Sequence, residues 1–408
     1  MNRFIGILGI IAILGIAYLL SNDKKNIDLR VVIWGLGLQL LFGIFILITP
    51  FGKPIFSWFD KLINKLLAFS QDGSQFLFAS FVDGKMHPAV INFAFAVLPT
   101  VIFFSALMAV LYHIGIMQKI IKIVALIMQK TMKTSGPETT SISANIFVGQ
   151  TEAPLVIKPF ISKMTNSELM AVMTGGFATV AGGVMAIYVG MLANIPGIAG
   201  HLMAASIMSA PAALVIAKIM YPESKKRNND EEFKLSSNLN EPVEGNVLEA
   251  LGNGATDGLK LAANIAAMLI AFVALISLSN YILSIFGTSL EDIFGYIFMP
   301  LAYLMGAPWS ESHILGSLLG QKIVLTELIA YVNLSNMTVG IDISEKTAIL
   351  ASYALCGFAN FASIGIQLGG IGSIAPERKK DLAKLVTKAM FGGALASWLT
   401  ATIAGILI

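Results

Sequence analysis

The stretches GPETTSISANIFVGQTEAPLVIKPFI (136–161) and WSESHILGSLLGQKIVLTELIAYVNLS (309–335) decide the fold. Each is apolar overall, yet each carries an acid near its middle, Glu152 in the first and Glu327 in the second, with Gln, Thr and Gly nearby. A straight helix across a membrane would expose these acids to lipid, which is costly. A hairpin buried in protein avoids that cost. The two stretches therefore predict two re-entrant hairpins.

The composition supports a membrane as the solvent. The chain has 408 residues, of which 56% are hydrophobic and only 12% are charged, whereas a soluble domain has about 25% charged residues. A core of ordinary size cannot hide so much apolar side chain from water. The net charge of +3 is too small to indicate nucleic-acid binding. One cysteine, Cys356, excludes a disulfide framework.

Hydropathy predicts an all-α polytopic membrane protein with about eight transmembrane helices. A bilayer core of about 30 Å needs about 20 apolar residues per helix. The first apolar run has no cleavage pattern after Leu20, so we interpret it as a spanning helix rather than a signal peptide. By this measure the expected spans lie near residues 4–21, 30–50, 91–113, 166–194, 197–221, 260–284, 346–374 and 383–407.

Two further segments, 54–70 and 114–133, are amphipathic and predict helices at the membrane surface. Because basic residues gather on the inner side of a membrane, the clusters at 119–133, 225–227 and 378–380 place the N-terminus outside. In this orientation the first hairpin enters from the inside and the second from the outside. The C-terminus then lies outside.

The two halves of the sequence resemble each other weakly. Gly176-Phe-Ala-Thr-Val-Ala-Gly182 is similar to Gly357-Phe-Ala-Asn-Phe-Ala-Ser363, and a Gly-Gln and a Thr-Glu precede each copy. A Gly-Phe-Ala match alone would be an ordinary coincidence. Together with the opposed hairpins, the paired Thr-Glu favours an inverted repeat, which in transporters places the substrate site near the membrane midplane.

This interpretation divides the chain into five parts. We expect N-terminal scaffold helices and an interfacial helix at 1–113, a first transport repeat at 114–221, a polar cytoplasmic linker at 222–245, a scaffold helix with amphipathic segments at 246–308, and a second transport repeat at 309–408.

Glycine is frequent in the expected helices 166–194 and 346–374. Close helix packing would explain these glycines, but Thr179 and Asn360 lie at matching positions, which favours a helix break that exposes backbone groups to a cavity. The polar groups at these breaks and in the hairpins suit a neutral ligand rich in hydroxyl and amide groups. With no arginine cluster in the sequence around them, an anionic substrate is disfavoured.

The motifs GQTEAPLVIKPF (149–160), GQKIVLTELIAY (320–331) and CGFANFASIGIQLGG (356–370) resemble those of the concentrative nucleoside transporters. The resemblance extends from about Asn145 to the C-terminus. It implies a homotrimer in the cell (inner) membrane that takes up nucleosides with a cation gradient. Each protomer would have a scaffold and a transport domain that moves like an elevator.

The resemblance also supplies the site residues. Residues matching those that contact the substrate are Gln150, Thr151, Glu152, Val184, Glu327, Phe358, Asn360 and Ser363. Residues matching the sodium ligands are Asn145 and Thr179 through their side chains and Val148 and Val180 through their carbonyl oxygens. Oxygen ligands suit a hard cation, and no cofactor besides this coupling ion is expected.

One position departs from the family motif G-x-K-x-x-x-N-E-F-V-A, because Thr326 replaces the asparagine before Glu327. The leading hypothesis is a sodium–nucleoside symporter. A proton-coupled symporter is the alternative, since a carboxyl group in a low-dielectric site such as that of Glu327 holds a proton more readily. An intramembrane hydrolase is disfavoured because no nucleophile motif accompanies the acids, and a channel would pass solute only downhill.

Overall fold

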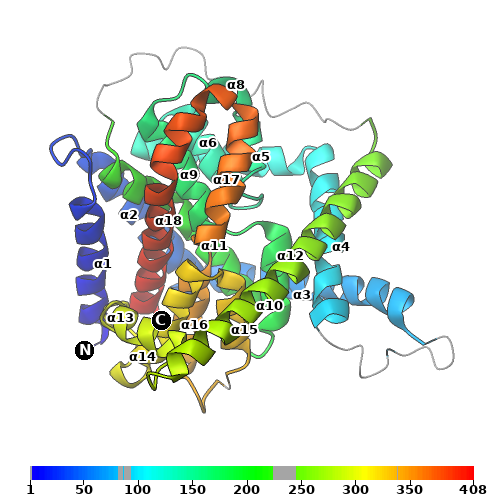
Figure 1. Ribbon diagram of the computed structural model, residues 1–408. Coiled ribbons are helices and arrows are strands. Elements are labelled where there is room, and N and C mark those ends of the chain that lie inside the picture. The colour runs from blue at the N-terminus through cyan, green and yellow to red at the C-terminus, as the bar shows by residue number, and fades with distance from the viewer. Residues whose placement is uncertain (1, 81–85, 87–92, 224–244, 338) are drawn as a thin grey trace.

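The computed structural model describes residues 2–80, 86, 93–223, 245–337 and 339–408, and these residues form helices with one isolated bridge between Val339 and Ile343 (Figure 1). The first half contains α1 (Asn2–Leu19), α2 (Leu29–Gly43), η1 (Ile44–Ile48), α3 (Gly52–Phe78), η3 (Phe93–Val97), α4 (Leu98–His113), α5 (Ile116–Met132), α6 (Gly136–Asn145), α7 (Ala153–Val156), α8 (Lys158–Ile161), α9 (Asn166–Ala178), α10 (Gly182–Met191) and α11 (Ile198–Met220). The second half contains α12 (Val247–Ser284), α13 (Leu290–Leu304), α14 (Trp309–Val324), α15 (Glu327–Ser335), α16 (Glu345–Leu355), α17 (Phe361–Ile374), η4 (Pro376–Arg378) and α18 (Lys379–Leu407).

Six helical stretches of the described residues are long and apolar enough to cross a membrane: Leu29–Ile48, Phe93–His113, Asn166–Met191, Ile198–Met220, Val247–Ser284 and Pro376–Leu407. They match six of the eight expected spans. The expected span 4–21 is a shorter apolar helix, Phe4–Leu19, and the expected span 346–374 is divided between α16 and the shorter apolar helix Phe361–Ile374. The helix that contains the expected span 260–284, α12, begins earlier than that span, at Val247. Its first turns carry Glu249, Asp257 and Lys260, which a search for apolar residues excludes.

Helices α3 and α5 occupy the two segments predicted to be amphipathic. Helix α3 continues to Phe78, eight residues beyond the expected end at residue 70 (78 − 70). Exposed Trp58 and Phe76 show that part of its apolar surface lacks cover in the single chain. The location of both helices at a membrane surface stays a prediction.

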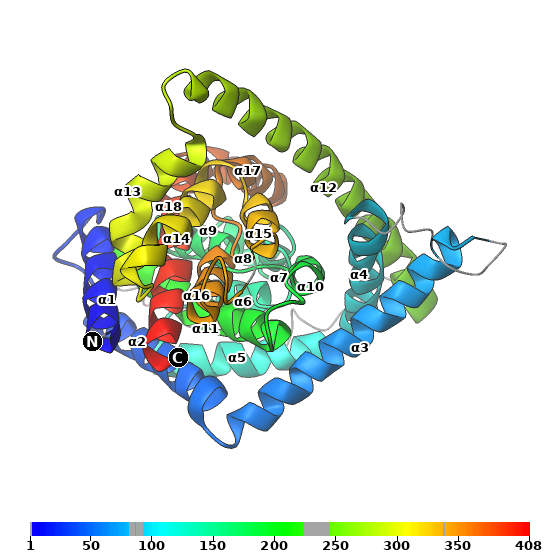
Figure 2. The same ribbon diagram turned by 90° about the horizontal axis from the view of Figure 1, so that it is seen from below.

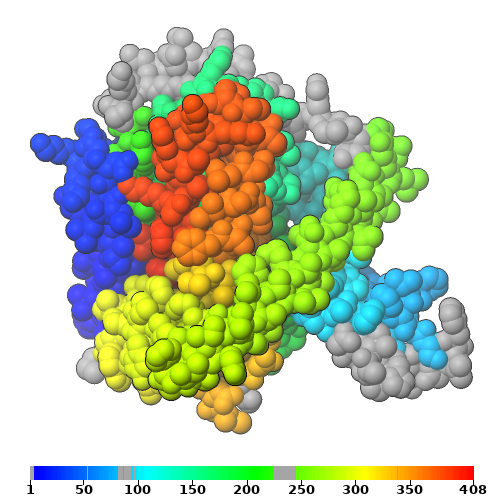
Figure 3. All heavy atoms as spheres, viewed as in Figure 1, coloured from blue at the N-terminus to red at the C-terminus, as the bar shows by residue number. Residues whose placement is uncertain are grey.

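Helices α4 and α12 form an outer layer that crosses beside the main bundle (Figure 2). They approach closely because α12 presents Gly254 and Gly258 to α4. A Cβ atom at Gly254 would lie 2.8 Å from the Ser105 carbonyl oxygen, and one at Gly258 would lie 2.7 Å from the Ile102 Cα atom. Small residues spaced by four are a common means of close helix contact in membranes. Beyond this contact α12 is largely exposed and forms a continuous band across one face (Figure 3).

Both stretches predicted as hairpins fold back through a turn, with the expected bounds: the second has one helix on each side of its turn, and the first has α6 before its turn and the two short helices α7 and α8 after it. The first runs from α6 at Gly136 to the end of α8 at Ile161, and the second runs from α14 at Trp309 to the end of α15 at Ser335. Figure 1 shows α8 near one end of the molecule and α14 near the opposite end. The helices of each hairpin are shorter than a full membrane span. The turn between them has backbone groups outside any helix, and such a turn is tolerated at membrane depth where protein surrounds it or where it lines a cavity.

The two helices predicted to be broken are interrupted at the expected residues. Residues 179–181 separate α9 from α10, and residues 356–360 separate α16 from α17. The breaks face each other, because a Cβ atom on Gly357 would lie 2.7 Å from the carbonyl oxygen of Phe177. Gly357 also has a φ of +130°, which a side chain would strain. Only glycine fits this contact. The predicted polar linker 222–245 lies mostly outside the described residues.

Arg378 joins the end of the first hairpin to the connection between α17 and α18. Its guanidinium donates to the carbonyl oxygens of Ile161 (3.2 Å), Ser162 (3.1 Å) and Met164 (2.6 Å), and to the Asn166 side chain (3.1 Å). A helix leaves its last carbonyl groups unpaired, so a cationic donor stabilises such an end. This arginine therefore ties residues of the two halves together.

A buried ion pair joins α6, α9 and α11. Lys218 Nζ lies 2.7 Å from Glu138 Oε2 and donates to Ser167 Oγ at 3.0 Å. The side chains of Lys218 and Glu138 are 9% and 2% exposed. Because a buried charge without a partner is costly, each group depends on the other.

We expect Lys218→Met to lower stability by about 3 kcal/mol, because it leaves Glu138 buried and unpaired. The double variant Lys218→Met/Glu138→Gln removes both charges and recovers most of that loss. Thermal unfolding of the detergent-solubilised protein measures both effects. A single variant as stable as the wild type, or a double variant less stable than the single, contradicts this role of the pair.

Candidate functional site

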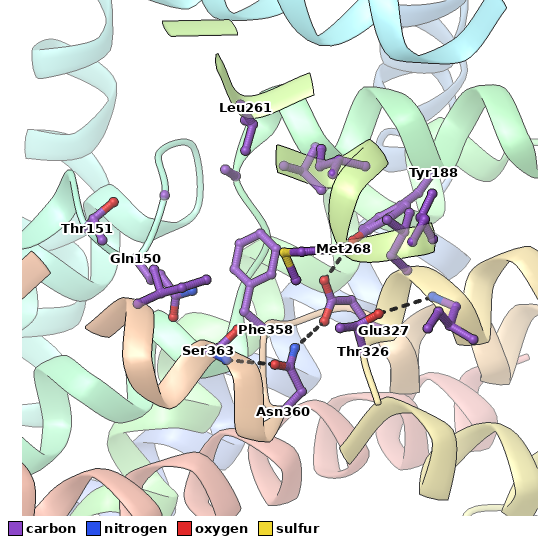
Figure 4. A pocket seen from close by; sticks show the side chains of 18 of the residues that line it. Gln150, Thr151, Tyr188, Leu261, Met268, Thr326, Glu327, Phe358, Asn360 and Ser363 are labelled. Atoms are coloured by element: carbon purple, nitrogen blue, oxygen red, sulfur yellow. Dashed lines mark hydrogen bonds between the residues drawn. The ribbon is translucent and has the colours of Figure 1, made fainter. Parts of the chain in front are cut away.

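A cavity of about 190 Å³ lies where the two hairpin turns, both helix breaks and α12 meet (Figure 4). Every residue predicted to contact the substrate lines it: Gln150, Thr151, Glu152, Val184, Glu327, Phe358, Asn360 and Ser363. They come from the first hairpin, α10, the second hairpin and the break before α17. The structure thus brings together residues separated by more than 200 positions. Their role in binding stays a prediction.

The carboxylate of Glu327 lies at one end of the cavity. It is the first residue of α15 and is 5% exposed. Its Oε1 accepts a hydrogen bond from the Tyr188 hydroxyl at 2.9 Å, and its Oε2 accepts one from Asn360 Nδ2 at 2.7 Å. The N-terminus of a helix also favours a negative charge. Each carboxylate oxygen keeps a lone pair for a further donor, such as a ligand hydroxyl.

Asn360 orients its amide through the start of α17. It is the N-cap residue, and its Oδ1 accepts a hydrogen bond from the Ser363 backbone N–H at 2.8 Å. The oxygen is thereby committed to the helix, so the Nδ2 group faces Glu327. Figure 4 shows Asn360, Ser363 and Glu327 as a connected polar group. This end of the cavity therefore presents carboxylate and hydroxyl oxygens.

The opposite end is formed by the turn of the first hairpin. In this turn the Thr151 hydroxyl donates to Glu152 Oε1 at 3.0 Å, and Gln150 Oε1 accepts from Gln367 Nε2 at 3.1 Å. Figure 4 shows the Phe358 ring between Gln150 and Glu327. Glu152 is exposed, unlike Glu327. The expectation that protein encloses both acids is therefore wrong for Glu152, because the turn leaves its carboxylate open.

The four residues predicted to bind sodium lie on segments that contact each other. Asn145 ends α6, Thr179 follows α9, and the Phe147 carbonyl oxygen accepts a hydrogen bond from Gly182 N–H at 3.0 Å. Asn145 is 1% exposed, and within the described part of the chain neither atom of its amide has a hydrogen-bond partner. Thr179 Oγ1 donates to the Gly175 carbonyl oxygen at 3.1 Å and keeps its lone pairs. Oxygen atoms are the ligands that a hard cation prefers, and a sodium site formed by Asn145 and Thr179 with the carbonyl oxygens of Val148 and Val180 stays a prediction.

Three family models match the chain. "Na+ dependent nucleoside transporter C-terminus" matches residues 201–405, "Na+ dependent nucleoside transporter N-terminus" matches residues 8–81, and "Nucleoside recognition" matches residues 94–195. The "Uncharacterized transporter YutK" of Bacillus subtilis (strain 168) is 44% identical, with all of both chains covered.

The chain belongs to the Na+-dependent nucleoside transporter family.

Other members show how far the similarity extends. The "Sodium/nucleoside cotransporter 2" of Rattus norvegicus is 40% identical over all of this chain, which covers 63% of the rat protein. A solved structure of CNTnw in an inward-facing, substrate-bound state is 40% identical, with a TM-score of 0.90 and coverage of 100% of this chain and 98% of that chain. The sequence-based family prediction is confirmed. The chain is a multi-pass membrane protein of a transporter family and is not an enzyme.

Sequence reasoning missed Tyr188, which lines the cavity and bonds Glu327. The helical spacing in the sequence does indicate Tyr188, because it lies four residues after Val184 and thus on the same face of α10. It also missed the apolar wall from α12, formed by Leu261, Ile265, Met268 and Leu269. These residues recur at helical spacing, but an apolar stripe in a membrane helix usually faces lipid or another helix.

Thr326, which replaces the family asparagine, lines the cavity as the N-cap residue of α15. Its hydroxyl accepts a hydrogen bond from the Ile329 backbone N–H at 3.4 Å. Threonine and asparagine are both favourable N-caps, so the start of the helix is kept. What the substitution removes is an amide group beside Glu327.

We expect graded losses of nucleoside affinity at the Glu327 end. Glu327→Gln replaces a charged acceptor and should weaken uridine binding about 100-fold, whereas Tyr188→Phe removes one neutral donor but keeps the carboxylate and should weaken it about five-fold. Calorimetric titration in detergent measures both. Tyr331→Phe is the matched control, because Tyr331 stacks on Tyr188 but donates to the Ser352 carbonyl oxygen. Wild-type affinity in Glu327→Gln, or equal losses in the two tyrosine variants, contradicts the assignment.

Proposed function

We propose that this protein is a symporter that takes up nucleosides across the bacterial cell membrane with a sodium gradient. The observation that carries the proposal is the two-ended cavity, with carboxylate and hydroxyl groups at the Glu327 end and amide and hydroxyl groups at the Gln150 end. A ribose with hydroxyl donors and a base with polar edges complement these ends. The resemblance assigns the base to Gln150, Thr151 and Glu152, with Val184 as an apolar neighbour. It assigns the ribose to Glu327, Asn360 and Ser363, with Phe358 packed beside them.

The link between ion and substrate is the turn of the first hairpin. Asn145 stands five residues before Gln150, so a sodium ion at Asn145 and Thr179 would order the same turn that carries the base-binding residues. A ligand that stabilises the competent conformation raises affinity for the second ligand, and the effect is reciprocal. The buried Asn145 amide supports this site, because neither of its polar atoms has a hydrogen-bond partner among the described residues and an ion would satisfy its oxygen.

We also propose the finer architecture. The opposed hairpins, each followed by a broken helix, form an inverted repeat of two re-entrant units, at 114–221 and 309–408. Together they make the transport domain, and α4 and α12 belong to the scaffold. Polar cavity residues come from the repeats, whereas α12 contributes only apolar side chains. Such a wall suits a substrate-loaded domain that slides along it in an elevator mechanism. The exposed apolar surfaces of α3 and α12 suit contacts with lipid and with the other subunits of a homotrimer.

Uptake into proteoliposomes tests the function. With a sodium gradient we expect labelled uridine to accumulate above its external concentration, and with choline in place of sodium we expect no accumulation at either of two pH values. Accumulation that ignores sodium and rises in acid would establish the proton-coupled alternative, for which buried Glu327 is the candidate group. Equilibration without accumulation would refute symport, because it shows only downhill passage of the kind that a channel gives.

A substitution at Thr179 tests the proposed sodium site separately from the substrate site. Thr179→Ala removes a hydroxyl ligand, so we expect the half-saturating sodium concentration to rise about tenfold, which corresponds to one ligand of modest energy. The ranking of nucleosides should stay unchanged. Thr174→Ala is the matched control, since Thr174 is equally buried in α9 but lies five residues earlier. A sodium titration that equals the wild type removes Thr179 from the site.

A further inference from the structure

Gln367 lies behind the base-binding end of the cavity and is not among the residues that line it. It belongs to α17 in the second half of the chain and is fully buried. Its Nε2 donates two hydrogen bonds, one to the Met173 carbonyl oxygen at 3.0 Å and one to Gln150 Oε1 at 3.1 Å. Gln367 thus joins α9 to the turn of the first hairpin.

These bonds fix which way both amides point. The oxygen and nitrogen of a glutamine side chain are distinguished by their partners. A backbone carbonyl can only accept, so the Gln367 atom that faces Met173 must be nitrogen. The Gln150 atom that faces the same nitrogen must then be oxygen. The Gln150 nitrogen is left as a donor, and within the described residues it has no protein acceptor recorded.

Packing holds this arrangement in place. A Cβ atom on Gly176 would lie 2.5 Å from Gln367 Nε2 and 3.0 Å from Gln150 Cβ. Both side chains therefore rest against the bare backbone of α9, with no room to change places. Gln150 is 6% exposed, and the open part of its surface faces the cavity.

Thr151, the residue after Gln150, presents a hydrogen-bond acceptor instead of a donor. Because the Thr151 hydroxyl donates to Glu152 Oε1, its hydrogen is committed and its lone pairs remain as acceptors. The turn therefore presents an N–H donor at Gln150 beside an oxygen acceptor at Thr151. A base edge with a carbonyl oxygen next to a ring N–H is complementary to this pair. Uracil and hypoxanthine have such an edge, whereas cytosine and adenine have an amino group next to a bare ring nitrogen.

We propose that Gln367 is a specificity-determining positioning residue: it holds the Gln150 amide so that the site selects oxo bases over amino bases. This inference rests on the proposed function, since it assigns the base to the Gln150 end. A mismatched edge would set donor against donor and leave buried groups unpaired, which discriminates strongly. We expect uridine to bind at least about tenfold more tightly than cytidine, and inosine more tightly than adenosine.

Calorimetric titration of the full-length protein in detergent with sodium tests the proposal. Gln367→Met keeps the length of the side chain but removes the donor, so the Gln150 amide can turn. We expect the uridine-to-cytidine affinity ratio to fall toward one, chiefly through tighter cytidine binding. Gln367→Glu presents an acceptor to Gln150 and should reverse the preference. Gln39→Met is the matched control, because Gln39 is also fully buried but its amide nitrogen donates within its own helix α2, to the Gly35 carbonyl oxygen. It should keep the wild-type ratio.

Each outcome is decisive. A ratio unchanged in a Gln367 variant that still binds uridine overturns the proposal, because a purely structural role moves both affinities together. Should neither variant fold, the wild type decides, since cytidine binding as tightly as uridine overturns the proposal without any variant. A third ligand, the ribonucleoside of 2-pyrimidinone, lacks the 4-oxo group and should bind about as weakly as cytidine. A wild type that binds no nucleoside with sodium refutes the proposed function itself.

Discussion

The contact of one helix break with the other is the constraint on which the site depends. At Gly357 the backbone of the second break lies against the carbonyl oxygen of Phe177, and no side chain fits between them. The positive φ at this residue turns the chain so that α17 restarts in a new direction. Two helix ends with unpaired backbone groups thereby meet in the protein interior, where polar side chains can satisfy them. The cavity is the space that remains beside this contact.

A carboxylate that is buried in such a place loses its hydration. For Glu327, interactions from three elements of the protein replace that hydration. Tyr188 comes from the first half, Asn360 from the second, and α15 contributes its own N-terminus. Burying a charge is costly unless hydrogen bonds replace its hydration. Among the described residues no cation forms an ion pair with this carboxylate at contact distance, because the ammonium group of Lys322 donates to the Ala354 carbonyl oxygen and to Ser397 instead. The carboxylate consequently stays free to exchange hydrogen bonds with a neutral ligand instead of being locked in an ion pair.

The parts of the fold that the sequence predicted are those with a local signal. Polar residues inside apolar stretches located both hairpins, and glycines beside Thr179 and Asn360 located both breaks. Gln367 and Tyr188 escaped because their bonds cross 217 and 139 positions of the chain, and nothing near either residue indicates its partner. The early start of α12 escaped for a different reason. Its polar first turns are helical because of capping by Asn246 and of packing on α4, and hydropathy reports neither.

Arg378 has a mechanical consequence. By clasping three carbonyl oxygens at the end of α8, it fastens the outer end of the first hairpin to the corner between α17 and α18, while Gln367 fastens the inner end of the same hairpin to α17. A hairpin that is bonded to the same neighbouring helix region at both of its ends does not move independently of that region. A displacement of the first hairpin would therefore move α17 as well, so the polar groups that the two halves bring to the cavity would keep their relative positions. The apolar wall from α12, which neither bond reaches, would be the part of the cavity that changes.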